Sequence, residues 1–209
     1  MSTHSLKDDS APNLLGFSRA QLEEFFIACG DKKFRAHQWM QWVHQRGVLD
    51  YDAMTNLSKT LRATLQSQTT LALPKVVVED FSTDGTVKWL LQVDGGNAIE
   101  TVYIPEKTRG TLCISSQVGC ALDCTFCATA RQGFNRNLTA AEIIGQVWVA
   151  NQRLRELNKN DTPITNVVFM GMGEPLLNFD KVMSAVHLLL DDFAYGLGCL
   201  LYTSDAADE

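Results

Sequence analysis

The stretch Cys120-Ala-Leu-Asp-Cys124-Thr-Phe-Cys127 brings three cysteines together in a C-x3-C-x2-C spacing. Three thiolates this close in sequence can hold three irons of a [4Fe–4S] cluster on one short loop. Electron-transfer clusters usually take four cysteine ligands, so a set of three leaves one iron open to a substrate or cofactor. We therefore predict that Cys120, Cys124 and Cys127 bind a [4Fe–4S] cluster.

Disulfides and zinc are the alternatives for these cysteines. The chain opens with Met1-Ser-Thr-His4 and has no apolar signal-peptide core, which indicates a cytoplasmic protein in a reducing compartment. A structural zinc site takes four ligands, usually as two pairs. No second pair of that kind occurs, and the four histidines are scattered singly. The cluster is favoured, and a zinc-binding RNA module stays as the alternative.

The composition fits one domain plus an accessory piece. The chain has 209 residues, is 45% hydrophobic and carries a formal net charge of −6. No apolar run approaches the ~20 residues of a membrane span. The negative total does not indicate a nucleic-acid binder, but an uneven distribution can hide a basic face. Basic residues gather beside Trp39 and Trp42, and again around the cysteine loop: Lys32, Lys33, Arg35 and Arg46, then Arg109, Arg131 and Arg136.

Helical signals dominate the first third of the chain. We expect residues 1–13 to be disordered and residues 14–73 to form a helical accessory domain, with helices near 18–29, 34–46 and 58–66. Ser18 is a good N-cap, Gln21 stands at the capping-box position, and Gly30 suits the residue after the helix. The aromatic and basic stretch in this domain is a possible RNA contact.

The period changes at Lys75 from helical to two. Strands at 75–81, 87–93 and 98–104 predict a β meander over residues 74–107. Residues 108–197 then alternate strand and helix, with strands at 111–115 and 164–170 and helices at 139–157 and 178–190. This alternation predicts an α/β fold with a parallel sheet.

Two motifs follow the two strands of that α/β part. The cysteine loop follows the first strand, and Gly173-Glu174-Pro175 follows the second. Sites in parallel α/β barrels gather at the C-terminal ends of strands, so we expect both motifs at one mouth. The segment around Gly173 lacks the third glycine of G-x-G-x-x-G, and Glu174 would repel a pyrophosphate, which excludes a dinucleotide loop.

Four longer strings carry a resemblance to a known family. They are Glu100-Thr-Val-Tyr-Ile-Pro-Glu106, Arg109-Gly-Thr-Leu-Cys113-Ile-Ser-Ser-Gln-Val-Gly119, Gln132-Gly-Phe-Asn-Arg-Asn-Leu138 and Phe169-Met-Gly-Met-Gly-Glu-Pro-Leu-Leu-Asn178. Together with the cysteine triplet they resemble the radical-SAM adenine C2 RNA methyltransferases of the RlmN and Cfr type, above all the dual-specificity rRNA and tRNA branch. The resemblance runs from Phe17 to about Leu197. It implies a partial radical-SAM (β/α) barrel, its first two β-α units only, after the helical domain and the meander.

The resemblance also implies a chemistry and its participants. S-adenosyl-L-methionine would bind the open iron, with Gly173-Glu174-Pro175 contacting its ammonium group. Such enzymes methylate C2 of an adenosine in large-subunit rRNA, and in tRNA, through a methyl-cysteine and a 5′-deoxyadenosyl radical. Cys113 matches the cysteine that resolves the protein–RNA adduct through a disulfide bond, and Glu100 matches a carboxylate that handles protons at the base. An electron donor such as a flavodoxin-type reductase system is implied as a partner. Another radical-SAM enzyme class on this scaffold is the alternative.

Residues 198–209 depart from the family pattern. The methyl-carrying cysteine has no counterpart, and Cys199, which lies in this segment, is not assigned that role. We expect a truncated or frame-shifted gene, or sequence joined from elsewhere. An α/β sheet cut after two units exposes an apolar edge and face. The chain as written is therefore expected to fold poorly and to lack methyltransferase activity.

Overall fold

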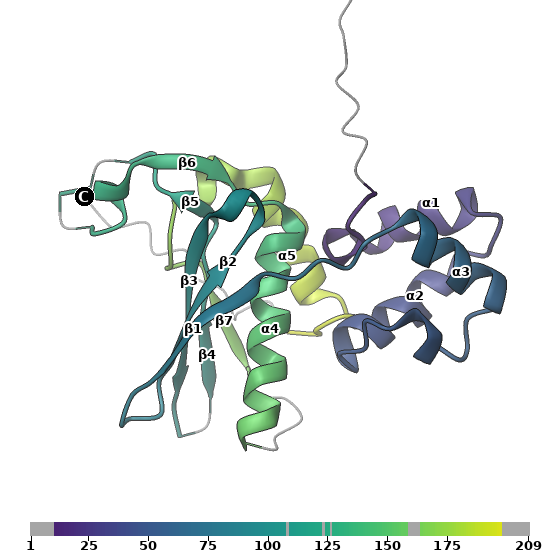
Figure 1. Cartoon of the computed structure of the whole chain (residues 1–209), viewed down its shortest axis with the longest axis horizontal. Coiled ribbons are helices and arrows are strands. Elements are labelled where there is room, and N and C mark those ends of the chain that lie inside the picture. Colours follow the sequence, from purple (N-terminus) through teal and green to yellow (C-terminus); the bar gives the residue numbers. More distant parts are fainter. Residues whose placement is uncertain (1–10, 108, 123, 126, 159–163, 198–209) are drawn as a thin grey trace, which may run out of the picture.

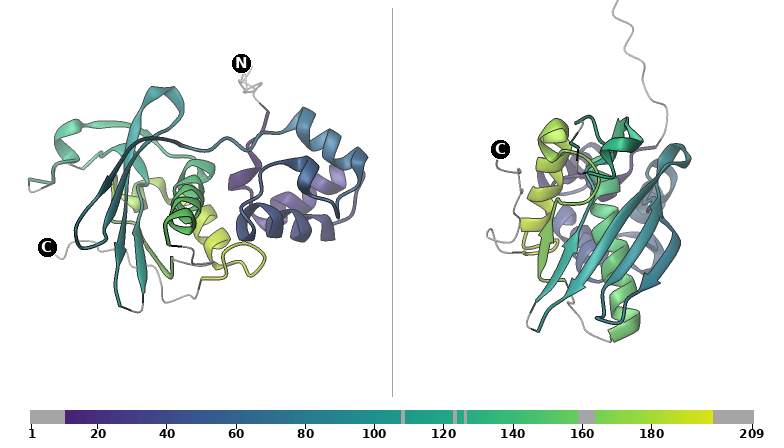
Figure 2. Two further views of the ribbon diagram at one scale, coloured as in Figure 1. Left: turned by 60° about the horizontal axis from the view of Figure 1, so that its bottom comes forward. Right: turned by 90° about the vertical axis from the view of Figure 1, so that its left-hand side faces the viewer.

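The computed structural model describes residues 11–107, 109–122, 124–125, 127–158 and 164–197. Figure 1 shows a helical lobe, residues 11–73, beside an α/β body formed by the described residues from 74 onward. The long helix α4 (Ala140–Asn158) lies between the sheet and the lobe, as the left view of Figure 2 also shows. None of the helices among these residues is long and apolar enough to cross a membrane.

The helical lobe contains α1 (Arg19–Ala28), α2 (Phe34–Met40) and α3 (Lys59–Gln68). The predicted start of α1 is confirmed, because Ser18 and Gln21 form a reciprocal capping box. The helix predicted over 34–46 is not uniform: after α2 the chain widens into a π-helix, η2 (Gln41–Gln45). The core of the lobe is formed by apolar side chains from all these helices, including Leu22, Phe26, Trp39, Met40 and Leu65.

The disorder predicted for residues 1–13 is wrong for its last part. Residues 1–10 lie outside the described residues, but Asn13 caps a short 3-10 helix, η1 (Leu14–Gly16), and bonds the carbonyl of Ala72. The backbone N–H of Thr70 donates to the carbonyl of Pro12 at 3.0 Å. The polar composition hid this anchoring, because it comes from a pairing with residues almost sixty positions away.

One mixed sheet forms the body. Its order is β1-β2-β3-β4-β7, in which β4 and β7 are parallel and the other neighbours are antiparallel. The strands are β1 (Lys75–Phe81), β2 (Val87–Gln92), β3 (Ala98–Pro105), β4 (Gly110–Cys113) and β7 (Asn166–Val168). The predicted boundary between a meander, 74–107, and an α/β unit, 108–197, is therefore not a structural division, because β3 pairs directly with β4.

The two faces of this sheet differ. Helices α4 and α5 (Phe179–Leu190) cover one face, where Trp89, Leu91 and Leu112 are fully buried. Thr101 of β3 donates to Gln146 of α4 on the same side. The opposite face, which we call the open face, carries the alternate residues of each strand, and these are half-buried or exposed. Its apolar members include Val78 and Ile104.

A two-stranded hairpin separates β4 from α4 and was not predicted. It consists of β5 (Gln117–Gly119) and β6 (Phe134–Asn137), with the 3-10 helix η5 (Ala130–Gln132) before β6. The cysteine loop lies between the two strands. Gly119 has φ +73° and approaches the carbonyl of Gly133 so closely that a Cβ would lie 1.8 Å from that oxygen. Glycine is therefore required where the loop leaves β5.

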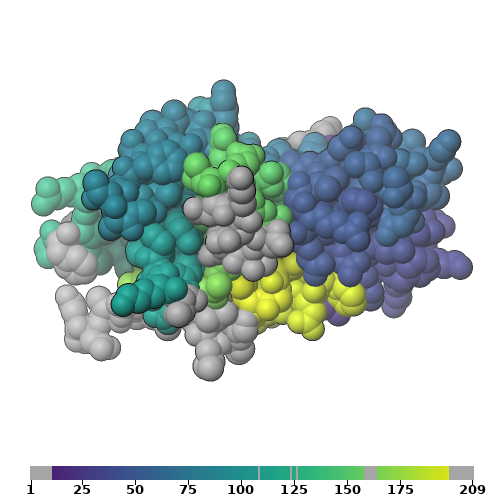
Figure 3. Space-filling view, turned by 90° about the horizontal axis from the view of Figure 1, so that it is seen from below, coloured from purple at the N-terminus to yellow at the C-terminus, as the bar shows by residue number. Residues whose placement is uncertain are grey.

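The segment after α5, residues 191–197, lies against the helical lobe, visible as yellow against blue in Figure 3. Arg19 and Asp191 form a two-bond ion pair, each bond 2.7 Å long. The Phe193 ring stacks on His37 with centroids 4.3 Å apart. These contacts fix the lobe to the body.

Candidate functional site

The cysteine hairpin and the Gly-Glu-Pro turn meet at one edge of the sheet. Strands β4 and β7 are parallel, and their backbone bonds continue past the strand ends: Ile114 N–H donates to Val168 O at 2.9 Å, and Gly171 N–H to Ile114 O at 3.1 Å. Ser116 N–H then donates to Met172 O at 2.8 Å. The segments that follow β4 and β7 therefore leave the sheet side by side, in the arrangement expected from the strand and helix order.

The three cysteines of the loop are half-buried free thiols. Cys120 N–H donates to Gly133 O at 3.3 Å, and Cys127 N–H donates to Cys124 O at 3.0 Å. The backbone N–H of Ala130 donates to the Cys127 thiol and lowers its pKa. Within the part of the chain that the structure describes, no three His, Cys, Asp or Glu side chains are gathered closely enough to hold a metal ion. The loop thus carries the predicted donors but does not hold them together.

Cys113 and Glu100 lie on the open face. Cys113 stands directly opposite Val102 in the β3–β4 ladder, and Glu100 precedes Val102 by two residues on the same side of β3. Burial raises the pKa of the Cys113 thiol, although the Met170 N–H that it accepts works the other way. The structure therefore brings these two predicted site residues to neighbouring positions of one face.

Glu100 pairs with Lys88 across β2 and β3. The Lys88 ammonium and the Glu100 carboxylate are 2.9 Å apart, and the Glu100 side chain is 48% exposed. The hydrogen bond and the charge of Glu100 raise the pKa of Lys88. The Glu100 carboxylate is therefore accessible from the open face.

The Gly173-Glu174-Pro175 turn is held by the hairpin. Gly173 has φ +93°, and a Cβ on it would lie 2.4 Å from the Cβ of Gln117. Glu174 N–H donates to Gln117 Oε1 at 3.0 Å, and the Glu174 carboxylate caps the 3-10 helix η6 (Pro175–Asn178) by accepting from Leu176 N–H at 3.0 Å. Pro175 is buried as the first residue of that helix.

Buried amides and hydroxyls support this edge, and the sequence reading missed them. Gln146 of α4 accepts from Thr101 and from the Ser115 N–H, and donates to the Ser115 carbonyl. The Ser115 hydroxyl donates to Glu100 O at 2.7 Å and accepts from Met172 N–H at 2.9 Å. The signal available in the sequence was the polar run Ser115-Ser-Gln117 after an apolar strand.

Arg136, one of the basic residues around the cysteine loop, uses its guanidinium within the fold. Its guanidinium makes two bonds to Glu142, of 2.8 and 2.7 Å, and donates to Asp94 O at 2.7 Å. Glu142 also accepts from Thr139 N–H at 2.9 Å, and its own N–H donates to the Thr139 hydroxyl at 3.1 Å, which forms a capping box at the start of α4. Arg136 therefore joins β6 to α4 and to the turn after β2.

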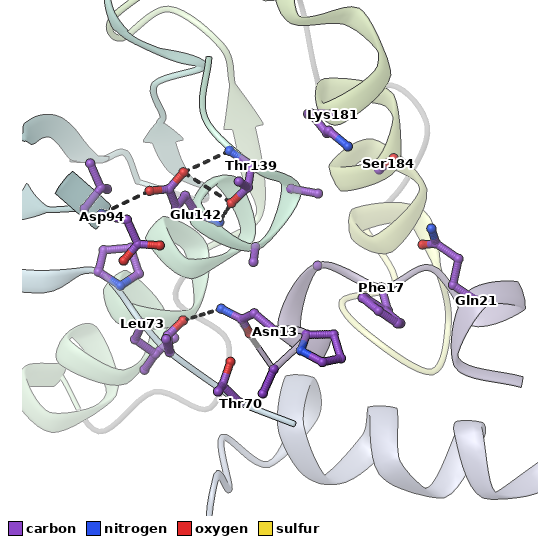
Figure 4. Close-up of a pocket in the computed structure, with 18 of the residues that line it drawn as sticks. Asn13, Phe17, Gln21, Thr70, Leu73, Asp94, Thr139, Glu142, Lys181 and Ser184 are labelled. Atoms are coloured by element: carbon purple, nitrogen blue, oxygen red, sulfur yellow. Dashed lines mark hydrogen bonds between the residues drawn. The ribbon is translucent and has the colours of Figure 1, made fainter. Parts of the chain in front are cut away.

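A cavity of about 480 Å³ lies between the lobe and the body. Figure 4 shows Thr139 and Glu142 on one wall, Phe17 and Gln21 of the lobe on another, and Lys181 of α5 beside them. None of the predicted site residues lines it. The cavity is therefore a feature of the lobe–body interface and not of the sheet edge.

Comparison with known proteins gives two family models. Residues 12–71 match the N-terminal domain of the ribosomal RNA large subunit methyltransferases, and residues 114–209 match the radical SAM superfamily. The second match extends over residues 198–209, the segment that we expected to depart from the family pattern.

Proteins named dual-specificity RNA methyltransferase RlmN are similar over 88% of this chain. Those from Marinobacter nauticus, Pseudomonas fluorescens and Stenotrophomonas maltophilia are 59%, 58% and 61% identical. The chain covers 50%, 49% and 47% of them, so it spans about half the length of the curated relatives it matches. A crystal structure of a radical SAM methyltransferase from Sphaerobacter thermophilus superposes with a TM-score of 0.82 at 41% identity, covering 91% of this chain and 55% of that one.

Proposed function

The chain belongs to the RlmN family of radical-SAM methyltransferases, and from that premise we propose that it forms the cluster-binding half of an RNA adenine C2 methyltransferase. The substrates would be an adenosine of large-subunit rRNA and an adenosine of tRNA. The observation that supports this most is the single sheet edge at which the cysteine hairpin meets the Gly173-Glu174-Pro175 turn, with Cys113 and Glu100 on the adjoining face.

The donor set of the loop fits a [4Fe–4S] cluster. Cys120, Cys124 and Cys127 are free thiols in one short loop, and the backbone lowers the pKa of Cys127 toward the thiolate that binds metal. Three thiolates leave one iron open, whereas a structural zinc site takes four ligands. Among the described residues the three thiols are not gathered into a metal site, so the loop would have to bring them together to hold a cluster.

S-adenosyl-L-methionine is the proposed second cofactor. Its ammonium group would meet the turn at Glu174, whose carboxylate is already fixed in direction by the Leu176 N–H. The bound cluster and cofactor supply the methyl group and the one-electron chemistry that an electron-poor C2 atom requires. The mixed sheet with α4 and α5 on one face would then be the first part of a radical-SAM (β/α) barrel, whose lumen is the open face.

Cys113 and Glu100 are the proposed reacting residues of the chain itself. Burial raises the pKa of Cys113, so its thiol stays protonated at neutral pH until a partner approaches. Cys113 would then resolve the protein–RNA adduct: its sulfur would bond to the sulfur of the methyl-carrying cysteine as the bond from that sulfur to the transferred carbon breaks. That carbon would stay on the RNA and take up a proton to become the methyl group. The five described cysteines are all free, so the structure contains no disulfide bond among them. Glu100, exposed beside Lys88, would take the proton that leaves C2.

The proposed RNA partner would also meet the helical lobe. The Arg46 guanidinium lies 4.2 Å from the Trp42 ring centroid, and Arg35 lies 4.8 Å from that of Phe34, which is 44% exposed. Guanidinium and aromatic planes of this kind stack on unpaired bases. An electron donor such as a flavodoxin-type reductase would serve the cluster.

Anaerobic reconstitution with iron and sulfide tests the cluster directly. We expect about four irons per chain and a brown chromophore, with an electron paramagnetic resonance spectrum that changes when S-adenosyl-L-methionine is added. Cys124→Ala should abolish the brown species. Cys29→Ala, at a half-buried thiol of the lobe, is the matched control and should leave it intact. A colourless protein that holds one zinc would refute the proposal and favour a zinc-binding module.

A further inference from the structure

Gln117 uses both ends of its side-chain amide to join two segments. Its Oε1 accepts from Glu174 N–H at 3.0 Å, and its Nε2 donates to Asn137 Oδ1 at 2.8 Å. Gln117 is 1% exposed, so its own amide oxygen and nitrogen are shielded from water. Glu174 belongs to the turn after β7, whereas Asn137 ends β6, the second strand of the cysteine hairpin. One buried side chain therefore connects the two motifs of the site.

The contacts around Gln117 carry the connection further. Asn137 lies opposite Gln117 in the β5–β6 ladder and donates through Nδ2 to Leu177 O at 3.3 Å. Asn178, also buried, donates to the carbonyls of Ser116 and Leu138 at 2.8 and 2.9 Å. The hairpin is thus bonded to both ends of η6. Among the described residues, Gln117 is the one whose side chain accepts from the Glu174 N–H.

Gly173 packs directly against the Gln117 side chain, which limits the residues that position 117 can hold. A Cβ on Gly173 would lie 2.4 Å from Gln117 Cβ and 2.6 Å from Gln117 Cγ, so the turn rests directly on the stem of the side chain. Glutamine supplies a donor and an acceptor at the end of a two-carbon stem. A methionine side chain fills a similar volume but has neither an amide donor nor an amide acceptor. A glutamate side chain lacks the N–H group that donates to Asn137 Oδ1.

We propose that Gln117 is a positioning residue that holds the cysteine hairpin and the Gly173-Glu174-Pro175 turn as one rigid unit. The inference rests on the proposed function, because it gives the reason such a tie matters there. A cofactor that binds the open iron of the hairpin and the turn at the same time needs the two held within about 0.5 Å of a fixed separation. Gln117 acts on the cofactor only through the backbone of Glu174 and the strand of Asn137.

Hydrogen exchange in the cluster-free chain tests the tie itself. In Gln117→Met we expect the Glu174 amide to exchange at least about tenfold faster, since one net hydrogen bond is lost from a buried site. Gln66→Met, at an exposed glutamine of α3, is the matched control and should leave that amide unchanged. Asn137→Ala, at an exposed residue of β6, guards against a variant that fails to fold. It should raise exchange at Glu174 less than Gln117→Met does.

Cofactor binding tests the consequence. In reconstituted protein, Gln117→Met and Asn137→Ala should both keep the iron content of the parent. The dissociation constant of S-adenosyl-L-methionine should rise about tenfold in Gln117→Met and by a smaller factor in Asn137→Ala. An unchanged Glu174 exchange rate, or a loss of iron with an unchanged dissociation constant, overturns the proposal. If the parent chain takes up no cluster, the proposed function is contradicted. The positioning role of Gln117 is then tested only by the Glu174 amide exchange rate in cluster-free Gln117→Met and parent protein.

Discussion

Replacing Glu142 by glutamine should destabilise the fold by about 2 kcal/mol at pH 7. The carboxylate is 8% exposed and makes two bonds of 2.8 and 2.7 Å with Arg136, which is 29% exposed, so solvent screens the pair little. Hydrogen bonds to charged groups contribute about 1.5–3 kcal/mol, and breaking a buried pair costs about 3–5 kcal/mol. Glutamine keeps one oxygen that can accept from the Thr139 or Asp94 N–H. The expected loss of stability therefore lies in the lower range, at about 2 kcal/mol.

The loss should depend on pH with a definite sign. Burial acts to raise the pKa of Glu142, but the hydrogen bond and charge of Arg136, with the Thr139 and Asp94 N–H groups, outweigh it and leave the pKa below its usual 4.5. A carboxylate whose pKa is lower in the fold contributes stability that is fully present above pH 4.5. That stability is lost as the pH falls through the folded-state pKa. The gap between the parent and Glu142→Gln should therefore narrow below pH 4.5.

Urea unfolding followed by tryptophan fluorescence at pH 7, 5.5, 4.5 and 3.5 measures this gap. Glu156→Gln is the matched control, because Glu156 is 54% exposed and pairs with Arg153 within the same helix at 3.4 Å. Its effect should stay within about 0.5 kcal/mol at every pH. A gap for Glu142→Gln that is as small as that of the control, or that stays constant down to pH 3.5, would refute the reasoning.

Three further predictions concern other parts of the molecule. Burial lowers the pKa of His44 to about 3, so below pH 6.5 the unfolded chain binds a proton that the folded chain does not. The free energy of unfolding then falls by at most about 1.4 kcal/mol per pH unit. In His44→Phe the urea midpoint should therefore depend less on pH between pH 6.5 and 5. Gly16→Ala places a Cβ 2.4 Å from Ala141 N and should cost about 1–3 kcal/mol by thermal unfolding, more than Gly30→Ala, whose φ is +79° but whose Cβ meets nothing within 4 Å. Iodoacetamide should alkylate Cys113 more slowly than free cysteine at pH 7.5, because burial raises the pKa of the Cys113 thiol. The alkylation rate is measured by mass spectrometry of the peptide that contains Cys113, and a rate equal to or faster than that of free cysteine would contradict this prediction.

Local chemistry explains what the sequence could predict. Ser18 and Gln21 are three residues apart and form a capping box. The buried Trp89 and Leu91 alternate with half-buried or exposed residues because a strand has period two. The cysteine spacing is likewise a local pattern. Each of these signals is complete within a few residues, so no knowledge of the tertiary fold was needed to read it.

The parts that sequence missed depend on distant partners. Strands β5 and β6 have three and four residues, too few to show a period, and they exist because Gln117 pairs with Asn137 across the cysteine loop. Arg136 was one of several basic residues around the cysteine loop, and only the fold shows that it pairs with Glu142. Asn13 resembled part of a polar tail, although it is bonded to Ala72.

The continuous sheet changes how the candidate site is understood. Glu100 lies on a strand of the predicted meander and Cys113 on the first strand of the predicted α/β unit, yet the register Val102↔Cys113 alone decides that both occupy the open face. A slip of one residue would turn Cys113 toward α4 and leave Leu112 exposed, at the cost of a fully buried leucine. The leucine that packs on the helix face therefore also aims the cysteine at the site, so packing and chemistry are specified by the same alternation.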